Sequence, residues 1–337
     1  MATSDETRAG GAAADDAGGG GRSEGTTATS PGPSVAGTTG TESAWGRLPT
    51  EARHPASREL DRLPTEEVVA LLIEEDRRGL AAALAERQAI ATAAGWLAET
   101  LAGGGTVLLT GAGTSGRLGV LEAAECPPTF GTDPERIRAA IAGGAEAVFA
   151  AREGAEDRED EGRAAAAGLG AGDLVIGLSA SSVTAYTRGS LAAARERGAR
   201  TVLLTCAARQ GLEGEAELVI ALDTGPEVLT GSTRLKAGSA TKAALNAITT
   251  AGMVRLGKVF ENWMVDLRPG SAKLVDRSAR IVAAAGEVGR ERAEELLAAA
   301  GGEVKTALVM ARRGVGADEA RRRLAAAGGF VRRALEG

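Results

Sequence analysis

Five short apolar runs, most of them separated by enough chain for a helix, constrain the fold of this 337-residue sequence. Each run has the length of a β-strand and ends near glycine, serine or threonine. Continuous apolar strands that alternate with helices are typical of a parallel sheet covered on both faces. The chain is therefore predicted to be an α/β protein. The runs are TVLLTG (106–111), RAAIAGG (138–144), DLVIGLSAS (173–181), RTVLLTC (200–206) and LVIALDTG (218–225).

Helices are expected on both sides of this strand region. Thr65, followed by two glutamates and then by apolar residues at helical spacing, predicts a capped helix start. A second helix is expected over 80–101, and a long one within 231–260. Beyond about residue 280, an Ala/Leu/Arg-rich stretch with glycine breaks predicts three short helices that form a small bundle.

The composition divides the chain into three parts. Residues 1–43 are rich in Gly, Ala, Ser, Thr and Asp, and such a segment buries too little apolar surface to offset its ordering entropy. We expect a disordered tail over 1–43, a sheet domain with its N-terminal helices over 44–279, and a helical domain over 280–337.

Charge and composition exclude several kinds of partner. The net charge is −6 and aromatic residues make up 2% of the chain, so neither phosphate neutralisation nor base stacking supports nucleic-acid binding. No apolar run approaches the roughly 18 residues of a membrane helix. Two cysteines and the lack of a secretory start predict a cytoplasmic protein.

The side-chain inventory also limits the chemistry. His54 is the single histidine, and no Cys-x-x-Cys pair is present, so neither a zinc site nor a Ser-His-Asp triad is expected. No metal or organic cofactor is predicted. The chemistry must then use carboxylates, lysines, hydroxyls and backbone amides.

A glycine-rich turn follows the first predicted strand. Gly111–Gly116 reads G-x-G-x-x-G, which is typical of a dinucleotide-binding turn. Such a site also needs an acidic residue at the tip of the second strand, where this chain has 142–144, Ala-Gly-Gly. The hydroxyls of Thr114 and Ser115, with the backbone at Gly116, instead favour a phosphate monoester bound at a helix start.

Two more hydroxyl-rich turns are candidates for the same site. Ser181 and Thr184 follow the third predicted strand, with simple helix capping as the alternative. The stretch 225–242 is dense in Gly, Ser, Thr and Lys, and Ser232 and Lys236 in it are candidate contacts to an anionic ligand. A capped helix start is the alternative for that stretch.

Two glutamates are candidates for acid–base chemistry. Glu125 precedes Cys-Pro-Pro, which predicts that it ends its helix, where the negative end of the dipole favours a protonated carboxyl. Glu156 lies in EGAED, directly before a charge run that is expected to be solvated. Ordinary surface charge is the alternative interpretation for both.

These motifs together resemble one family, the N-acetylmuramic acid 6-phosphate etherases, from about Thr50 to the C-terminus. The resemblance implies a SIS (sugar isomerase) domain, a homodimer, no cofactor, and a sugar phosphate as the small-molecule substrate. It also implies acid–base roles for Glu125 and Glu156. The expected reaction splits the D-lactyl ether of N-acetylmuramic acid 6-phosphate by elimination and water addition, in peptidoglycan recycling. The strings that carry the resemblance are TGAGTSGRLGVLEAAECPPTFGTDP, AGGAEAVFAAREGAEDRED, GPEVLTGSTRLKAGSATK and GKVFENWMVDL.

One loop departs from the family pattern. The family's second loop reads A-S-G-R-T-P-Y, and this chain has Ser182, Val183 and Ala185 where the family has Gly, Arg and Pro. A lost glycine can close a backbone approach, and a lost arginine removes a possible anion contact. The change therefore bears on phosphate affinity or on the choice of substrate.

The helix that carries Glu125 raises a problem of distance. An unbroken helix from Ser115 would place Glu125 roughly 15 Å away, which is longer than a hexose phosphate. Either the helix ends early and the chain folds back, or Glu125 serves the site of a neighbouring subunit. The second option would make the dimer a condition of activity.

Other functions remain open from the sequence. A non-catalytic sugar-phosphate sensor that regulates a partner needs neither glutamate, so the presence of both favours a carbon–oxygen lyase. An aldose–ketose phosphate isomerase uses similar proton chemistry, but the ECPP and EGAED contexts favour the etherase. A nucleotide-dependent dehydrogenase lacks the acidic residue after its second strand.

Overall fold

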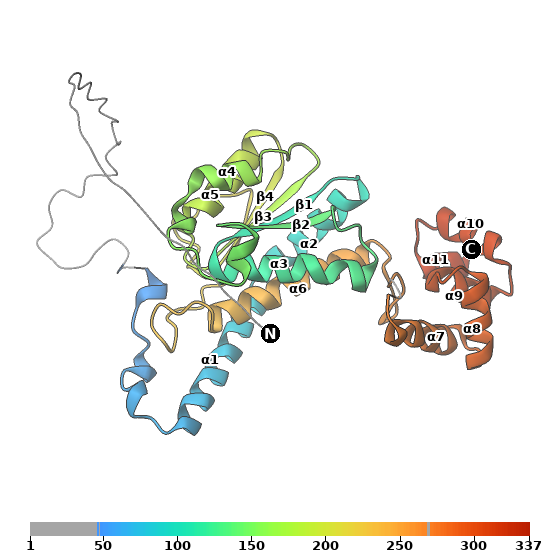
Figure 1. Ribbon diagram of the computed structural model, residues 1–337, viewed down its shortest axis with the longest axis horizontal. Coiled ribbons are helices and arrows are strands. Elements are labelled where there is room, and N and C mark those ends of the chain that lie inside the picture. Colours follow the sequence, from blue (N-terminus) through green and yellow to red (C-terminus); the bar gives the residue numbers. More distant parts are fainter. Residues whose placement is uncertain (1–45, 47, 268–269) are drawn as a thin grey trace, which may run out of the picture. The chain divides into compact units, whose positions relative to one another are not determined.

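A parallel sheet organises the computed structural model, which describes residue 46 and residues 48–267 and 270–337. Within these residues five parallel strands form one sheet in the order β2-β1-β3-β4-β5 (Figure 1). The predicted α/β class is confirmed. The predicted tail over 1–43 lies outside the described residues. The strands are β1 (Val107–Gly111), β2 (Ile137–Ile141), β3 (Leu174–Ser179), β4 (Arg200–Thr205) and β5 (Leu218–Ala221).

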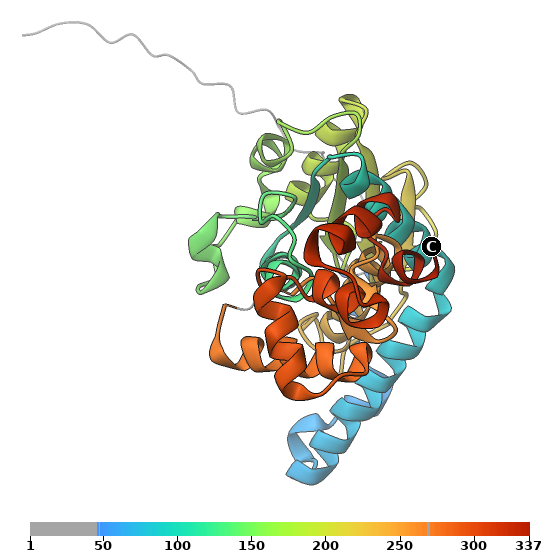
Figure 2. The same ribbon diagram turned by 90° about the vertical axis from the view of Figure 1, so that its right-hand side faces the viewer.

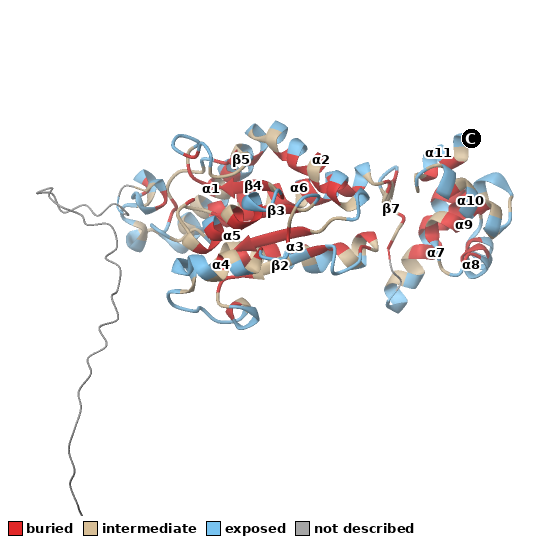
Figure 3. Cartoon of the chain, turned by 90° about the horizontal axis from the view of Figure 1, so that it is seen from above, coloured by how far each residue is buried: buried red, intermediate tan, exposed pale blue. Residues whose placement is uncertain are grey.

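The central strands β1, β3 and β4 are buried along nearly their whole length because both faces of the sheet are covered there, whereas the edge strand β2 exposes Arg138. Successive side chains of a strand point to opposite faces. Leu109 and Ile176 belong to the hydrophobic cluster on one face, whereas Leu108 and Val175 belong to the cluster on the other. All four are buried. Figure 3 shows the central strands as a buried layer between helices whose outer surfaces are exposed.

Helices of different origin cover the two faces. The cluster on one face also takes residues from α2 (Arg87–Ala102), α3 (Gly113–Phe130) and α6 (Lys236–Arg255). The cluster on the other face is completed mainly by α5 (Ala185–Glu196), against which the short α4 (Glu159–Ala165) packs.

The N-terminal helices differ in detail from the prediction. Short 3-10 turns at Pro49–Glu51, Pro55–Ser57 and Leu60–Arg62 precede α1 (Thr65–Ala85). Pro64 occupies the N-cap position and no side chain caps the helix, so the prediction that Thr65 caps it was wrong. The chain breaks at Glu86, and the stretch predicted as one helix over 80–101 is shared between α1 and α2.

The long helix predicted within 231–260 is shorter than that range. After α6 ends at Arg255, the chain forms a small antiparallel hairpin from β6 (Val259–Phe260) and β7 (Trp263–Met264). Asp266, just after the hairpin, pairs with Lys258 at 2.9 Å and with Lys305 at 2.7 Å. These ion pairs join the hairpin region to the C-terminal helices.

The C-terminal region has more helices than predicted. Five helices form it within the described residues, and they gather around one hydrophobic cluster (Figure 2). The prediction of three was wrong because α7 ends at Gly286 with a left-handed residue, Glu287, in place of a stop glycine. The predicted domain boundary at 279/280 lies inside α7, and the division into two domains stays a prediction. The helices are α7 (Ala272–Gly286), α8 (Arg290–Ala299), α9 (Val304–Arg313), α10 (Ala317–Ala326) and α11 (Val331–Glu336).

The contact between α4 and α5 gives a test of this packing. A Cβ atom on Gly162 would lie 1.9 Å from the carbonyl oxygen of Tyr186, closer than any real contact. We expect Gly162→Ala to lower the free energy of unfolding by about 2 kcal/mol or more, because backbone must move to make room. Gly168→Ala is the matched control, since no atom lies within 4 Å of its added Cβ. Urea unfolding of both variants measures the difference, and equal stabilities would contradict this packing.

Candidate active site

The register of the sheet brings the predicted turns together at one edge. Gly111 at the end of β1 lies beside Leu178 of β3, and Ser179 lies beside Thr205 of β4. Because the strands are parallel, the turns that follow β1 and β3 leave the same edge as neighbours. The two hydroxyl-rich turns predicted from sequence therefore do lie next to each other.

The turn after β1 leads directly into α3. A Cβ on Gly116 would lie 2.6 Å from the carbonyl oxygen of Gly111, so only glycine fits where the helix crosses the strand end. Thr114 and Ser115 lie half-buried in the first turn of α3. Backbone N–H groups in a first turn have no partner within the helix, so this turn offers amide and hydroxyl donors to an anion.

The turn after β3 is held by its own hydroxyls. Ser179 Oγ donates to Thr184 Oγ1 at 3.0 Å, and Ser182 Oγ donates to the carbonyl of Ser181 at 2.5 Å. Ser182 is buried and has φ +67°, in the left-handed region that favours glycine. The position at which the family pattern has glycine thus adopts a backbone conformation that favours glycine. Ser181 is half-buried beside it.

The start of α6 forms the third side of the candidate site. A Cβ built on Gly238 would lie 3.7 Å from Cγ2 of Thr114, which places the first turns of α6 and α3 in contact. Ser232 is half-buried in the turn before α6. That turn is tied to the N-terminal segment, since the N–H of Gly231 donates to the carbonyl of Thr50 at 3.2 Å.

Lys236 has an internal partner. Its side chain is 3% exposed, and its Nζ donates to Glu75 Oε2 at 2.6 Å and to the carbonyl of Pro226 at 2.8 Å. His54 Nε2 lies 3.2 Å from the same carboxylate oxygen. Burial alone would raise the pKa of Glu75, but the hydrogen bond and charge of Lys236, helped by His54 and Arg78, lower it. Lys236 thus joins the start of α6 to α1. Its contact with the substrate stays a prediction.

A second buried glutamate, not expected from the sequence, occupies the start of α6. Glu227 is 1% exposed and accepts hydrogen bonds from the N–H groups of Lys236 at 3.1 Å and Ala237 at 2.8 Å. Burial raises its pKa, although these two bonds oppose the rise. Since Glu227 already fills this helix start, the start of α3 is the better place for an incoming phosphate. The string GPEVLTGSTRLK contained this residue, but nothing in it signalled burial.

Glu125 lies well inside α3. The helix continues unbroken to Phe130 with Pro127 and Pro128 within it, so the prediction that Glu125 ends its helix was wrong. Gly131, in the left-handed region, ends the helix instead. Glu125 is exposed and lies about 15 Å along the axis from Ser115. The chain therefore does not fold back to bring Glu125 to its own phosphate turn.

The neighbouring acid on α3 has a structural role. Glu122, three residues before Glu125, is buried and accepts hydrogen bonds from Asn246 Nδ2 at 2.8 Å and Thr249 Oγ1 at 2.5 Å. Both donors belong to α6. Glu122 thus joins the two helices that carry the candidate site.

Glu156 lies on the segment after β2. It belongs to the short 3-10 turn Ala155–Asp157 and is exposed. An earlier turn of this segment, Ala145–Val148, is tied to α3, because Arg117 donates to the carbonyls of Ala147 at 2.8 Å and Val148 at 2.9 Å. The first turns of α3 therefore hold one end of the segment that carries Glu156.

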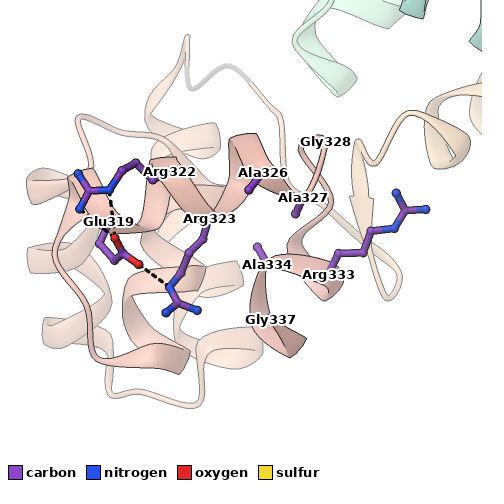
Figure 4. Close-up of a pocket in the computed structure, with 9 residues that line it drawn as sticks. All are labelled: Glu319, Arg322, Arg323, Ala326, Ala327, Gly328, Arg333, Ala334 and Gly337. Atoms are coloured by element: carbon purple, nitrogen blue, oxygen red, sulfur yellow. Dashed lines mark hydrogen bonds and ion pairs between the residues drawn. The ribbon is translucent and has the colours of Figure 1, made fainter.

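Other possible centres lack this chemistry. No cluster of His, Cys, Asp or Glu among the described residues is arranged to hold a metal ion, and no helix in the described chain is long and apolar enough to cross a membrane. A cavity of about 850 Å³ lies among the C-terminal helices (Figure 4). Its Glu319 pairs with Arg322 and Arg323, and none of the predicted site residues lines it.

Comparison with known families first defines the class. Residues 154–251 match the model of the SIS domain, and residues 89–195 match that of the glucokinase regulatory protein N-terminal SIS domain. The matched stretches include strands β1, β2, β3, β4 and β5 with the turns described above. The chain is therefore a SIS-domain protein.

Full-length relatives define the particular family. The chain is 49% identical over 271 residues to N-acetylmuramic acid 6-phosphate etherase of Parasynechococcus marenigrum (strain WH8102), covering 80% of this chain and 86% of that protein. It is 48% identical to the etherase of Streptomyces avermitilis, covering 78% and 85%, and 48% identical to that of Cutibacterium acnes, covering 79% and 88%. The protein belongs to the N-acetylmuramic acid 6-phosphate etherase family.

The left-handed backbone of Ser182 leads to a stability prediction. We expect Ser182→Gly to raise the free energy of unfolding by about 0.5 kcal/mol, because the left-handed penalty that glycine removes, about 1–2 kcal/mol, exceeds the roughly 1 kcal/mol lost with the hydrogen bond from Ser182 Oγ to the carbonyl of Ser181. Ser181→Gly is the control, since its backbone is not left-handed and the added glycine freedom should destabilise. Thermal unfolding of the two variants checks this, and a Ser182→Gly protein that melts lower would contradict it.

The buried thiols give a second prediction. Burial, followed by the charges of Glu122 and Glu125, raises the pKa of Cys126 to about 12, and burial raises that of Cys206 to about 11. Because only the thiolate reacts, neither cysteine should be alkylated by iodoacetamide at pH 8 in the folded protein. Mass spectrometry should show two modifications only after unfolding in guanidinium. Modification of the folded chain would contradict the burial.

Proposed function

We propose that this chain cleaves the D-lactyl ether of N-acetylmuramic acid 6-phosphate, releasing N-acetylglucosamine 6-phosphate and D-lactate in peptidoglycan recycling. One observation carries the proposal: the sequence is nearly half identical to etherases over most of their length, and it retains the glutamates of both ECPP and EGAED. The enzyme is a carbon–oxygen lyase that works without a cofactor.

The phosphate binds at the edge of the sheet where strands β1 and β3 end, because N–H and hydroxyl groups there can donate hydrogen bonds to it. The first turn of α3 supplies backbone N–H groups and the hydroxyls of Thr114 and Ser115, with Gly116 allowing the close crossing. Ser181 and Thr184 approach from the neighbouring turn, and Ser232 from the turn before α6. Glu227 at the start of α6 repels an anion there, which directs the phosphate to α3.

The reaction follows from the acidity of C2 in the open-chain sugar. C2 lies next to the C1 aldehyde, so a carboxylate at Glu156 can take its proton. The electron pair left on C2 forms a C2=C3 double bond as the C3–O bond breaks, and Glu125 protonates the departing lactyl oxygen. Water then adds its oxygen to C3, C2 regains a proton, and the sum is ether plus water giving alcohol plus D-lactate. The mechanism requires both glutamates. Which of them removes the C2 proton and which protonates the lactyl oxygen is the assignment that kinetics must test.

The length of α3 favours a homodimer with shared sites. Because Glu125 lies about 15 Å along a continuous helix from Ser115, the Glu125 of one chain is best placed to serve a second chain. Dimerisation is then a condition of catalysis. We also infer a cytoplasmic location, which suits two thiols that form no disulfide.

A sugar-phosphate sensor is the second candidate. The match of residues 89–195 to the glucokinase regulatory protein N-terminal SIS domain favours it, because that name denotes a regulator. A sensor would bind the sugar phosphate at the same turns without using either glutamate. Retention of both residues favours the lyase.

Removing either carboxylate tests the chemistry. We expect Glu125→Gln and Glu156→Gln each to lower the rate of D-lactate release about 100-fold or more, because each loses a proton transfer while phosphate binding remains. Glu153→Gln, an exposed neighbour in the same charge run, is the control and should keep full activity. Lactate is measured with D-lactate dehydrogenase. Well-folded wild-type protein that binds the substrate but releases no lactate would favour the sensor.

Mixed dimers test the shared site. If Ser115 and Glu125 of one site come from different chains, a Ser115→Asp chain paired with a Glu125→Gln chain has one intact site and one site with both changes. Equal co-expression should then restore about a quarter of wild-type activity, since half of the random dimers are mixed and half of their sites are intact. No recovery from folded, exchanging chains would show that one chain supplies both residues.

A further inference from the structure

Phe149 is the most exposed large apolar residue of the described chain. It is 92% exposed, whereas the other exposed large apolar residues lie between 44% and 67%. An aromatic side chain that stays in water contributes almost none of its apolar area to the stability of the fold. Packing among the described residues therefore gives this ring no structural role.

The backbone nevertheless holds Phe149 in one place. The residue ends the 3-10 turn Ala145–Val148, and its N–H donates to the carbonyl of Glu146 at 3.2 Å. The guanidinium of Arg117 binds the two carbonyls that directly precede Phe149. A turn fixed at these points presents the ring to solvent.

Arg117 also places the ring beside the phosphate turn. It follows Gly116 directly at the start of α3, where the phosphate is proposed to bind. Its Nε donates to the carbonyl of Val148 at 2.9 Å, so a single arginine side chain connects this helix start to the residue before Phe149. A sugar joined to a phosphate at this turn can extend to the ring.

The segment that carries the ring then returns to the same edge of the sheet. A Cβ atom on Gly143 would lie 3.3 Å from Cβ of Ala155, so the residue before Glu156 packs on the chain just after β2. The N–H of Ala142 donates to the carbonyl of Gly111 at 3.0 Å, which sets this part of the chain against the glycine turn after β1. The aromatic ring and the candidate catalytic carboxylate are thus both held near the phosphate turn.

We propose that the ring of Phe149 stacks on the C–H face of the sugar ring of the bound sugar phosphate. The inference deepens the proposed function and rests on it for the identity of the sugar. The axial C–H bonds of a hexopyranose form an apolar face with weakly positive hydrogens, which suits the negative face of an aromatic ring. Stacking covers the exposed ring and fixes the orientation of the sugar relative to Glu156.

Binding of the reaction product tests the contact without catalysis. Phe149→Ala should weaken binding of N-acetylglucosamine 6-phosphate about 10-fold, since the stacking is lost, and leave binding of inorganic phosphate unchanged. Phe149→Tyr should bind the product like the wild type, whereas Phe149→Leu should lose most of the affinity, because leucine has no aromatic face. Phosphorus-31 NMR titration measures both ligands. An equal loss for both ligands, or full affinity in Phe149→Leu, would overturn the inference.

The Phe149→Trp variant gives a spectroscopic signature of the same contact. Its tryptophan emission should move to shorter wavelength when N-acetylglucosamine 6-phosphate is added, because the ring leaves water. Inorganic phosphate should cause no shift. The wild type, with three native tryptophans, supplies the baseline. Emission that does not respond to the sugar phosphate contradicts the contact.

Stability and assembly controls exclude indirect effects. Because Phe149 is exposed, Phe149→Ala should leave urea unfolding unchanged. Val275→Ala, at an exposed position of α7, is the matched control and should change neither unfolding nor binding. Sedimentation velocity should give the same species for the wild type and Phe149→Ala. A change of assembly state in Phe149→Ala would overturn the inference, since a second chain would then cover the ring.

Lactate assays separate the inference from the proposed reaction. With N-acetylmuramic acid 6-phosphate, Phe149→Ala should raise KM about 10-fold and leave kcat within about twofold, because the ring transfers no proton. Lactate release by a wild type whose product binding does not depend on Phe149 overturns the stacking and leaves the reaction standing. Product binding that depends on Phe149, without lactate release by the wild type, does the reverse.

Discussion

The buried ion pair between Lys236 and Glu75 holds together parts of the chain that the sheet alone does not connect. Glu75 belongs to α1, Lys236 begins α6, and His54 reaches the same carboxylate from the segment before both helices. Taking such charges out of water is costly, and the pair is tolerable because hydrogen bonds satisfy the ammonium and the carboxylate together. Substituting Glu75 would leave the buried ammonium of Lys236 without its ion-pair partner, whereas substituting Lys236 would leave Glu75 with Arg78 at 2.7 Å and His54 at 3.2 Å. The position of the start of α6, and with it one wall of the site, follows from this pair.

The sheet and its turns could be predicted from sequence because they rest on local patterns. Leu108 and Leu109 point to opposite faces and are both buried, so a continuous apolar run was enough to signal a covered parallel strand. The crossing at Gly116 is likewise encoded in a short glycine pattern. Where the role of a residue depends only on its own strand or turn, the local sequence is enough to predict the structure.

The site was less predictable because its charged residues depend on tertiary partners. Lys236 reads as a cation next to a phosphate turn, but a carboxylate 161 residues earlier in the chain takes its ammonium. Glu227 and Glu122 lie in stretches with no local sign of burial, yet both are buried against α6. No local pattern distinguishes such residues from solvated ones. The helix stop at Glu287 was missed for a similar reason, since the left-handed residue there is not a glycine.

The two prolines inside α3 change the surface around Glu125. Proline has no N–H, so Pro127 and Pro128 cannot donate to the carbonyls of Ala123 and Ala124, four residues earlier. Two backbone oxygens beside the Glu125 carboxyl thus lack the N–H donors that they would have in a helix without proline. A molecule that packs on this stretch of α3 meets two carbonyl oxygens that accept no helical hydrogen bond. Hydroxyl and amide groups can donate to these oxygens, whereas a purely apolar surface would leave them unsatisfied.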